Sequence, residues 1–260
     1  MANYWEDRMA RAQTALTAKN KKQIDKQLKK YYGEAMKRVI ADFEGTYNKV
    51  LLAVESGKEP TPADLYKLDS YWKMQGNLKL ELQKLGDKQI AALSKEFELH
   101  FFDIYYSIAL QSEPAFTQVS RESVMQIING IWCADGKTWS QRIWENTALL
   151  AETLNEELIH CIATGKKTTE LKNLLQDRFG VSYSRADALV RTEMTHIQTQ
   201  AAQKRYQDYG IKKVMVWADK DERRCEVCGE LHEKTFPVGT RMPIPAHPRC
   251  RCSIIPVVED

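Results

Sequence analysis

The stretch "CEVCGELHEKTFPVGTRMPIPAHPRCRC", residues 225–252, holds four of the six cysteines and two of the five histidines of this 260-residue chain. Two thiolates spaced as in Cys225-x-x-Cys228 can turn onto one ion, and Gly229 permits the tight loop that this requires. The candidate ligands of the whole stretch are Cys225, Cys228, His247, Cys250 and Cys252. A structural zinc takes four such ligands, so one of the five is spare.

Three kinds of site fit these residues: a disulfide staple, a catalytic metal and a structural metal. The N-terminal segment "MANYWEDRMARAQ" has no apolar core of signal-peptide length, and no segment of the sequence is apolar enough to span a bilayer. We therefore expect a reducing cytosol, where clustered cysteines hold metal more often than they form disulfides. Four protein ligands leave zinc no open position for water, so we expect the ion to stabilise the fold without catalysing a reaction.

The segment after Gly210 is too small to be stable by apolar burial alone. It carries few large apolar side chains, and segments of this size often depend on a bound metal for their folding free energy. Its first part, "KKVMVWA", alternates as a strand does, with Val214 and Val216 on one face and Met215 and Trp217 on the other. We therefore expect a small β-containing, zinc-clipped C-terminal subdomain.

Most of the first 209 residues are predicted to be helical, because apolar residues recur every three or four positions. Thr61, Pro62 and Asp64 are typical of a helix start, whereas Gly86 and Gly180 are expected to end helices. The expected helices cover residues 24–54, 62–86, 90–108, 138–165, 168–180 and 184–210. The fold class is therefore α+β, with a predominantly helical N-terminal scaffold.

Two regions are expected along the chain. A helical N-terminal region covers residues 1–119, and a second domain covers residues 120–260. In the second domain, short helices at 120–209 lead into the β-containing metal-knuckle tail at 210–260.

The charge of the chain is nearly balanced, at +3, which by itself does not indicate a nucleic-acid-binding protein. Locally, eight basic residues between Lys19 and Arg38 outnumber two acidic ones. The favoured interpretation is a solvated helix face, and the alternative is a strip that contacts phosphate. The lysines that would make this contact are Lys21, Lys22, Lys26, Lys29 and Lys30.

The segment "LVRTEMTH", residues 189–196, contains two opposite charges, Arg191 and Glu193, within one expected helix. Two helical residues this far apart point in different directions and cannot pair on one face. The favoured interpretation is that both are partly buried anchors that tie this helix to the β-containing tail. The alternative is an acid–base or phosphate-binding pair, but no third catalytic group is evident. We therefore expect no enzymatic activity.

The stretch "ALVRTEMTHIQTQAAQKRYQDYGIKKVMVWADKDERRCEVCGELHEKTF", followed by "PIPAHPRCRC", closely resembles the phage Mu protein F-like family of head-morphogenesis proteins. Besides the five candidate ligands, the residues that carry the match are Arg191, Thr192, Glu193, Trp217, Asp221, Arg223 and Arg251. The resemblance extends over residues 120–258, whereas the N-terminal region matches only in being helical.

Two positions depart from the family pattern. Glu233 stands where glycine is common, which argues against a tight turn at that point, and Arg249 stands where relatives often have asparagine. The Cys-Arg-Cys ending is typical of the family, so the resemblance does not identify the spare thiol. Our preferred ligand set is Cys225, Cys228, His247 and Cys250, with Cys252 as the substitute.

The resemblance implies a minor capsid protein of a tailed bacteriophage or prophage, acting in procapsid assembly, portal association or genome delivery. The implied partners are portal and capsid or scaffold proteins, and in some relatives DNA. The implied location is the virion, at the capsid interior or portal vertex, with the host cytoplasm during assembly. A structural zinc is the expected cofactor. Two alternatives stay open: a metal-dependent enzyme such as a nuclease or transferase, and a DNA-binding module packaged in the virion.

Overall fold

The computed structural model describes residues 4–53, 60–109, 119–218, 221–222 and 224–257. Its elements, in chain order, are α1 (Tyr4–Ala53), α2 (Pro62–Tyr66), α3 (Asp69–Ser107), α4 (Arg121–Asn129), α5 (Trp139–Ala163), α6 (Thr168–Asp208), β1 (Lys213–Trp217), α7 (Glu226–Leu231), β2 (Thr235–Pro237) and β3 (Ser253–Val257). Helices dominate, and the strands of the described ranges all follow α6, which confirms the α+β class. None of the described helices combines the length and apolar character that crossing a bilayer requires.

The chain forms two compact units, and each unit is built from separate stretches of sequence. The first comprises residues 1–25, 92–139 and 187–260, and the second comprises residues 26–91 and 140–186. Stretches from both sides of residue 119 enter each unit. The boundary between the regions 1–119 and 120–260 is a division along the sequence, and it stays a prediction.

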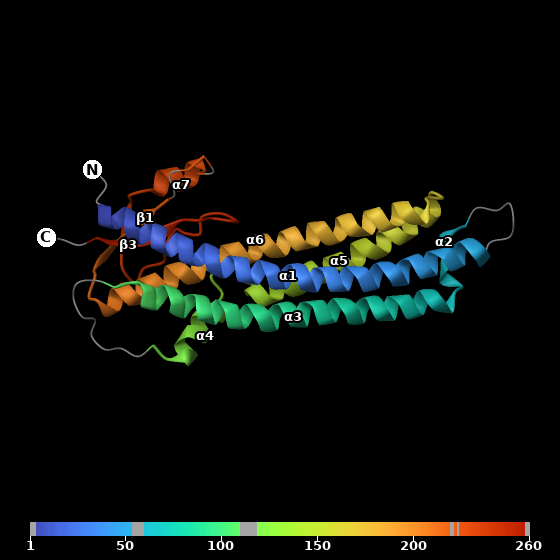
Figure 1. Ribbon diagram of the computed structural model, residues 1–260, viewed down its shortest axis with the longest axis horizontal. Coiled ribbons are helices and arrows are strands. Elements are labelled where there is room, and N and C mark those ends of the chain that lie inside the picture. The colour runs from blue at the N-terminus through green and yellow to red at the C-terminus, as the bar shows by residue number, and fades with distance from the viewer. Residues whose placement is uncertain (1–3, 54–59, 110–118, 219–220, 223, 258–260) are drawn as a thin grey trace. The chain divides into compact units, whose positions relative to one another are not determined.

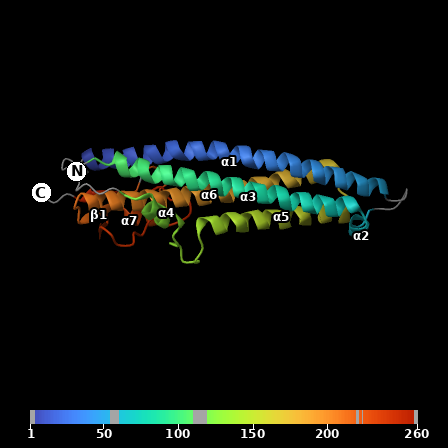
Figure 2. The same cartoon turned by 90° about the horizontal axis from the view of Figure 1, so that it is seen from below.

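The second unit is a bundle of helical segments from α1, α3, α5 and α6, which run side by side in Figures 1 and 2. The hydroxyl of Tyr47 on α1 donates to the carbonyl of Cys161 on α5 at 3.2 Å. The hydroxyl of Tyr71 on α3 donates to Asn155 on α5 at 3.3 Å. Leucines and aromatic residues from all four segments form its core, among them Phe43, Tyr47, Leu78, Leu82, Leu154, Leu158, Leu171 and Leu175.

In the first unit, α6 lies at the centre and is covered on all sides. Every residue from Glu193 to Thr199 is buried, although most of them are polar. An ordinary surface helix buries only one stripe, so buried polar side chains must find hydrogen-bond partners on the neighbouring elements. On α3, Nε2 of His100 donates to the carbonyl of Met194 at 3.2 Å. The first unit therefore positions α6 through specific polar contacts as well as through apolar packing.

A three-stranded antiparallel sheet in the order β2-β1-β3 completes the first unit. On one face, Trp217 of β1 and Ile255 of β3 pack against Ala10 of α1. Val214 and Val216 are also buried. This agrees with the two-sided pattern predicted for residues 212–218, in which both faces carry large apolar side chains.

Several predicted helix boundaries agree with the structure. α2 follows Thr61, whose backbone N–H and hydroxyl both donate to the carboxylate of Asp64, at 3.1 and 2.6 Å. α5 is followed by Gly165 and α6 by Gly210, both with the positive φ typical of glycine after a helix. The segment "SEPAF", expected to close the third helix, lies outside the described residues, and α3 ends at Ser107.

The prediction that Gly86 and Gly180 end helices is wrong, because both lie inside longer ones, α3 and α6. A glycine costs roughly 1 kcal/mol relative to alanine inside a helix, which favourable packing can outweigh. At Gly86 the indole of Trp144 occupies the place of a side chain. A Cβ added there would lie 2.4 Å from Cζ3 of Trp144. Gly86 therefore allows close packing of α3 against α5 and does not stop the helix.

At Gly180 the helix continues because Phe179 before the glycine and Ser182 two positions after it are held in the core. Phe179 and Ser182 are both buried. The hydroxyl of Tyr32 on α1 donates to the carbonyl of Ser182 at 3.3 Å. These contacts hold the chain before and after Gly180 in one helical path.

Replacement of Gly86 by alanine tests this packing, with Gly76→Ala in the same helix as the matched control. An added Cβ at Gly76 meets nothing within 4 Å, so this variant should gain about 0.5–1 kcal/mol. Gly86→Ala must displace the indole of Trp144 and should be less stable than Gly76→Ala by about 1 kcal/mol or more. Urea denaturation of both variants measures the difference. Equal gains would show that Trp144 moves aside without cost.

Candidate metal centre

The first two candidate ligands lie at the start of α7. Cys225 is the N-cap residue, with extended backbone, and its Sγ accepts from the backbone N–H of Cys228 at 3.4 Å. Cys228 is buried, with 4% of its surface exposed. A sulfur acceptor at this position satisfies one of the free N–H groups at the helix start. The Cys-x-x-Cys spacing therefore brings both sulfur atoms to the same end of α7.

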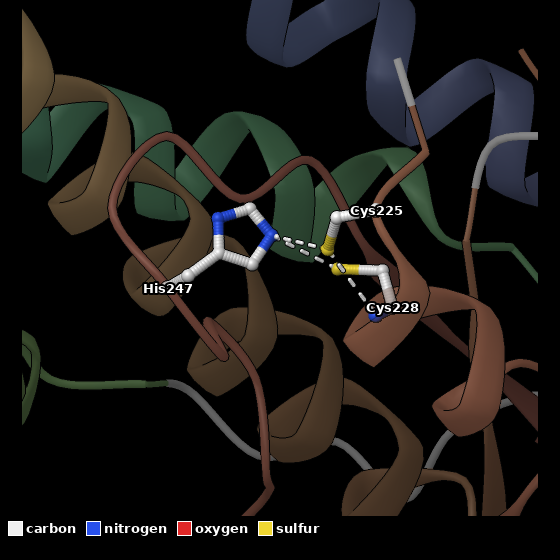
Figure 3. Close-up of side chains that lie close together, drawn as sticks. All are labelled: Cys225, Cys228 and His247. Atoms are coloured by element: carbon white, nitrogen blue, oxygen red, sulfur yellow. Dashed lines mark hydrogen bonds between the residues drawn. The ribbon is translucent and has the colours of Figure 1, made fainter. Parts of the chain in front are cut away.

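His247 approaches these two sulfur atoms from the loop that precedes β3. Its Nε2 lies 3.2 Å from Sγ of Cys225 and 3.1 Å from Sγ of Cys228 (Figure 3). The other ring nitrogen, Nδ1, donates to the carbonyl of Pro248 at 2.8 Å. This hydrogen bond selects the tautomer in which Nε2 keeps its lone pair for a metal.

Cys250 and Cys252 complete the cluster. The backbone N–H of Cys250 donates to the carbonyl of His247 at 3.2 Å, and Sγ of Cys250 lies 3.8 Å from Sγ of Cys228. The ligand atoms of Cys225, Cys228 and His247 lie within 4.8 Å of one another, and so do those of Cys228, Cys250 and Cys252. Because Cys228 belongs to both groups, all five predicted candidates converge on one place.

The spacing of these atoms fits a tetrahedral zinc ion. Zinc bonds of about 2.3 Å to sulfur and about 2.0 Å to nitrogen place two sulfurs roughly 3.8 Å apart, and a sulfur and a nitrogen roughly 3.5 Å apart. Cys228 and Cys250 have this sulfur separation, 3.8 Å. Nε2 of His247 is slightly closer to its two sulfurs. Thiolates with imidazole also prefer zinc to magnesium or calcium, so the donor set accepts zinc after small adjustments.

Hydrogen bonds within the cluster favour thiolates at two of its positions. The backbone N–H of Cys228 lowers the pKa of Cys225. The thiol of Cys252 donates to Cys250 and lowers the pKa of Cys250 to about 5, while burial raises the pKa of Cys228 to about 12. Metal ligands must be deprotonated. Cys250 therefore holds this form near neutral pH, and Cys225 loses its proton more readily than an ordinary thiol, whereas Cys228 must release a proton to bind an ion.

The space enclosed by the cluster is too small for an organic substrate. A cavity of about 30 Å³ lies between Cys225, Cys228, His247 and Cys252, which is room for an ion or one or two water molecules. Three arginines also line it: Arg224, Arg249 and Arg251. Their positive charge offsets the charge of nearby thiolates.

Two of the motif residues pair with each other beside this cavity. Arg251 donates to both carboxylate oxygens of Asp221, at 2.7 and 2.6 Å. A two-pronged contact of this kind fixes the direction of the guanidinium group. Trp217 lies in the sheet core, as described above, and Arg223 lies outside the described residues.

Two threonines of α6 tie the loop before β3, which carries His247 and Cys250 and is the candidate metal-binding loop, to the helix. The hydroxyl of Thr195 donates to the carbonyl of Cys250 at 2.6 Å. Oγ1 of Thr192 accepts from the backbone N–H of Arg249 at 3.0 Å. Thr192 and Thr195 thus tie this helix to the tail; the same role for Arg191 and Glu193 stays a prediction.

Glu193 instead contacts the loop that precedes α5. Its carboxylate accepts from the indole N–H of Trp132 at 2.8 Å, and the indole stacks on the ring of His196 with the centroids 4.3 Å apart. Sequence reasoning did not identify Trp132, Thr195 or His196 as functional. The spacing of Thr192, Thr195 and His196 on one side of α6 was the available signal.

The lysines of the basic strip differ in their surroundings. Lys22, Lys26, Lys29 and Lys30 are exposed. Lys21 is 5% exposed and forms ion pairs with two carboxylates, those of Asp25 and Asp187. Contact with phosphate therefore remains a prediction for the exposed lysines, and for Lys21 it would require these ion pairs to rearrange.

The turn that follows α7 corrects the expectation drawn from Glu233. The N–H of Lys234 donates to the carbonyl of Leu231 at 3.1 Å, and Glu233 has φ of 65°. With His232 at φ −58° and ψ 132°, this is a type II turn, whose third position favours glycine. A tight turn therefore forms although glutamate occupies that position. The ring of His232 packs edge-on against Trp217 with centroids 4.8 Å apart.

Comparison with known families agrees with the motifs in this part of the chain. Residues 152–255 match the family described as Phage Mu protein F like protein. The matched range includes α6, β1, β2, the first part of β3 and all five candidate ligands. This match supports the assignment to the phage Mu protein F-like family that the resemblance implied.

One similar curated protein comes from Enterococcus faecalis (strain ATCC 700802 / V583) and is named NAD(+)--arginine ADP-ribosyltransferase EFV. The two sequences are 26% identical over 188 residues, which cover 64% of this chain and 38% of the relative. The chain thus spans well under half the length of this relative. No solved structure matches the chain.

Replacement of Glu233 by glycine should stabilise the protein. Glycine removes the cost of a left-handed conformation, about 1 kcal/mol, at the third position of the type II turn. The substitution also removes the salt bridge between Glu233 and His232. The Glu233 side chain is more than half exposed, so this salt bridge contributes little to stability. Thermal unfolding compares this variant with Lys234→Gly, the next residue, which should be destabilised because it gains only backbone freedom. A lower melting temperature for Glu233→Gly would contradict the turn assignment.

Proposed function

We propose that this chain is a minor capsid protein of a tailed bacteriophage or prophage, acting in procapsid assembly, portal association or genome delivery. Its C-terminal segment is held in shape by one structural zinc ion. The family match over residues 152–255 supports the first part. The observation that carries the second part is the convergence of five thiol and imidazole side chains around a space of about 30 Å³.

Four of these residues hold the ion in this proposal: Cys225, Cys228, His247 and Cys250. Zinc bound there would cross-link α7 to the loop before β3 and contribute folding free energy directly. The chain's own residues prepare the site. Nδ1 of His247 is held by the carbonyl of Pro248, and Cys250 is held by its bond to Thr195. Cys252 is the spare thiol and supports the site as a donor to Cys250.

An enzymatic role has less support from the geometry. The carboxylate of Glu193 is 1% exposed and is engaged by the indole of Trp132, so a substrate would have to displace that contact. The cavity at the metal cluster has no room for an organic substrate. The transferase named for the Enterococcus relative shares a region that is 38% of its length with this chain. We therefore propose a structural role in the virion, with portal, capsid or scaffold proteins as partners.

Metal analysis of the purified protein tests the zinc proposal. We expect about one equivalent of zinc, and a C-terminal segment that becomes sensitive to protease after chelation. Cys250→Ser should lose the ion, whereas Cys252→Ser should keep it. Cys133→Ser is the matched control, because Cys133 lies outside the two groups of candidate ligands.

Two ligand sets are possible: Cys225, Cys228 and Cys250 with His247, or the four cysteines of the cluster. Each set predicts that a different variant loses zinc. Loss of zinc from Cys252→Ser together with retention in His247→Gln would show four cysteines as ligands. Absence of zinc from the unmodified protein, with a protease-resistant tail, would contradict the structural clip.

The head-protein proposal is tested in the phage or prophage that encodes the chain. Removal of the coding sequence should reduce the yield of infectious, DNA-filled particles, and electron microscopy with plaque counts measures this effect. The chain itself should co-purify with portal protein or procapsids. Normal yields of infectious particles without the protein would contradict the proposal.

A further inference from the structure

A second cavity lies in the first unit, away from the centre of the metal cluster. Its volume is about 170 Å³, and it is lined by residues of α1, of α6 and of the metal-binding loop. Its charged and polar lining includes Lys21, Lys22, Asp25, Arg191, Gln198 and Arg251. This volume suits a small group of a few heavy atoms and not a drug-sized ligand, which needs several hundred Å³.

Most of the charges around this cavity are already compensated. Lys21 pairs with Asp25 and Asp187. Asp187 also lies 3.4 Å from the guanidinium of Arg249. Lys21 and Arg249 together therefore balance the two carboxylates. Separately, the guanidinium of Arg251 is held by both carboxylate oxygens of Asp221.

Two cations lining the cavity lack such a partner. In the part of the chain that the structure describes, no carboxylate pairs with Arg191 or with Lys22, although both line the cavity. Lys22 is on α1 and Arg191 is on α6, so the two positive charges come from different walls. Arg191 is half-buried. A partly buried, uncompensated cation is costly unless an anion balances it.

We propose that this cavity binds a phosphate dianion, with Arg191 as its main contact and Lys22 as the second. A phosphate with about two negative charges balances two cations, whereas a carboxylate balances one. The planar guanidinium donates two parallel hydrogen bonds to phosphate oxygens, and lysine adds a point charge. The same chemistry is offered by inorganic phosphate and by the terminal phosphate of a nucleotide or of a DNA end.

This site assigns a role to Arg191 that its neighbours do not share. Thr192 and Thr195 tie the metal-binding loop to α6, and Glu193 holds Trp132. Within this motif, Arg191 is thus the residue that lines a cavity with an unbalanced charge. The inference does not rest on the proposed virion function, because it concerns binding by the isolated chain.

Isothermal titration of the full zinc-loaded chain with inorganic phosphate, in chloride buffer of constant ionic strength, tests the proposal. We expect saturable binding with one site per chain, competition by sulfate and no competition by acetate. Arg191→Gln should weaken the affinity about tenfold or more, because it removes a charge-assisted contact. Lys22→Gln should weaken it about two- to fivefold. The matched control is Arg185→Gln, an exposed arginine of the same helix, which should bind as the unmodified chain does.

Several outcomes would overturn the proposal. Equal affinity in Arg191→Gln and Arg185→Gln would do so, as would the absence of saturable binding by the unmodified chain. If Arg191→Gln fails to fold, the exposed Lys22→Gln variant decides, and an unchanged affinity there counts against the site. Zinc content measured on every variant separates a failure of this cavity from a failure of the metal clip.

Nucleotide competitors identify the source of the phosphate. Competition by a 5′-mononucleotide or a 5′-phosphorylated oligonucleotide supports a terminal phosphate, and competition by inorganic phosphate alone supports the free ion. An unphosphorylated oligonucleotide that competes as well as its phosphorylated form would contradict recognition of a dianion. In that case the basic residues would contact the diester backbone.

Discussion

The convergence of α7 and the loop before β3 on the sulfur of Cys228 is the constraint on which the C-terminal segment depends. Cys228 belongs to both groups of candidate ligands and is buried. The sheet itself is small, because β2 has three residues and β1 and β3 have five each. Strands this short are marginal without further support. A metal bound at Cys228 would therefore add a cross-link that the strand pairing alone does not supply.

The loop that carries His247 and Cys250 is also fixed from the side of α6. Thr192 and Thr195 engage consecutive backbone positions of that loop, at Arg249 and Cys250. Thr195 is 3% exposed, so its hydroxyl cannot turn to solvent, and its shorter contact is to the loop carbonyl of Cys250. The hydroxyl of the half-buried Thr192 donates to the carbonyl of Ala188 and accepts from the loop at Arg249. The polar character of a buried helix is thus explained by the need to hold an irregular loop that has few strand contacts of its own.

The sequence predicted well those features that depend on local chemistry. The grouping of the five candidate ligands, the alternation of β1 and the helix starts at Thr61 and Thr168 follow from spacing and from capping residues. Features that depend on distant neighbours could not be predicted. Gly86 is indistinguishable in sequence from a helix-ending glycine, because the indole that explains it lies in another helix. Likewise, the turn at Glu233 forms against the local preference of glutamate because the flanking segments are held elsewhere.

The metal cluster and the phosphate cavity share a dipeptide, and this links the two proposals physically. Cys250 and Arg251 both line the larger cavity, while Cys250 is a candidate metal ligand and Arg251 also lines the smaller cavity. The larger cavity is lined by α1, by α6 and by this loop. If zinc orders the loop, the part of the lining that the loop supplies exists only in the metal-bound chain. By linkage, a phosphate that needs that part of the lining must in turn favour the metal-bound form. Phosphate affinity should therefore fall on chelation even with Arg191 intact, whereas the loss of Arg191 leaves the cross-link at Cys228 in place.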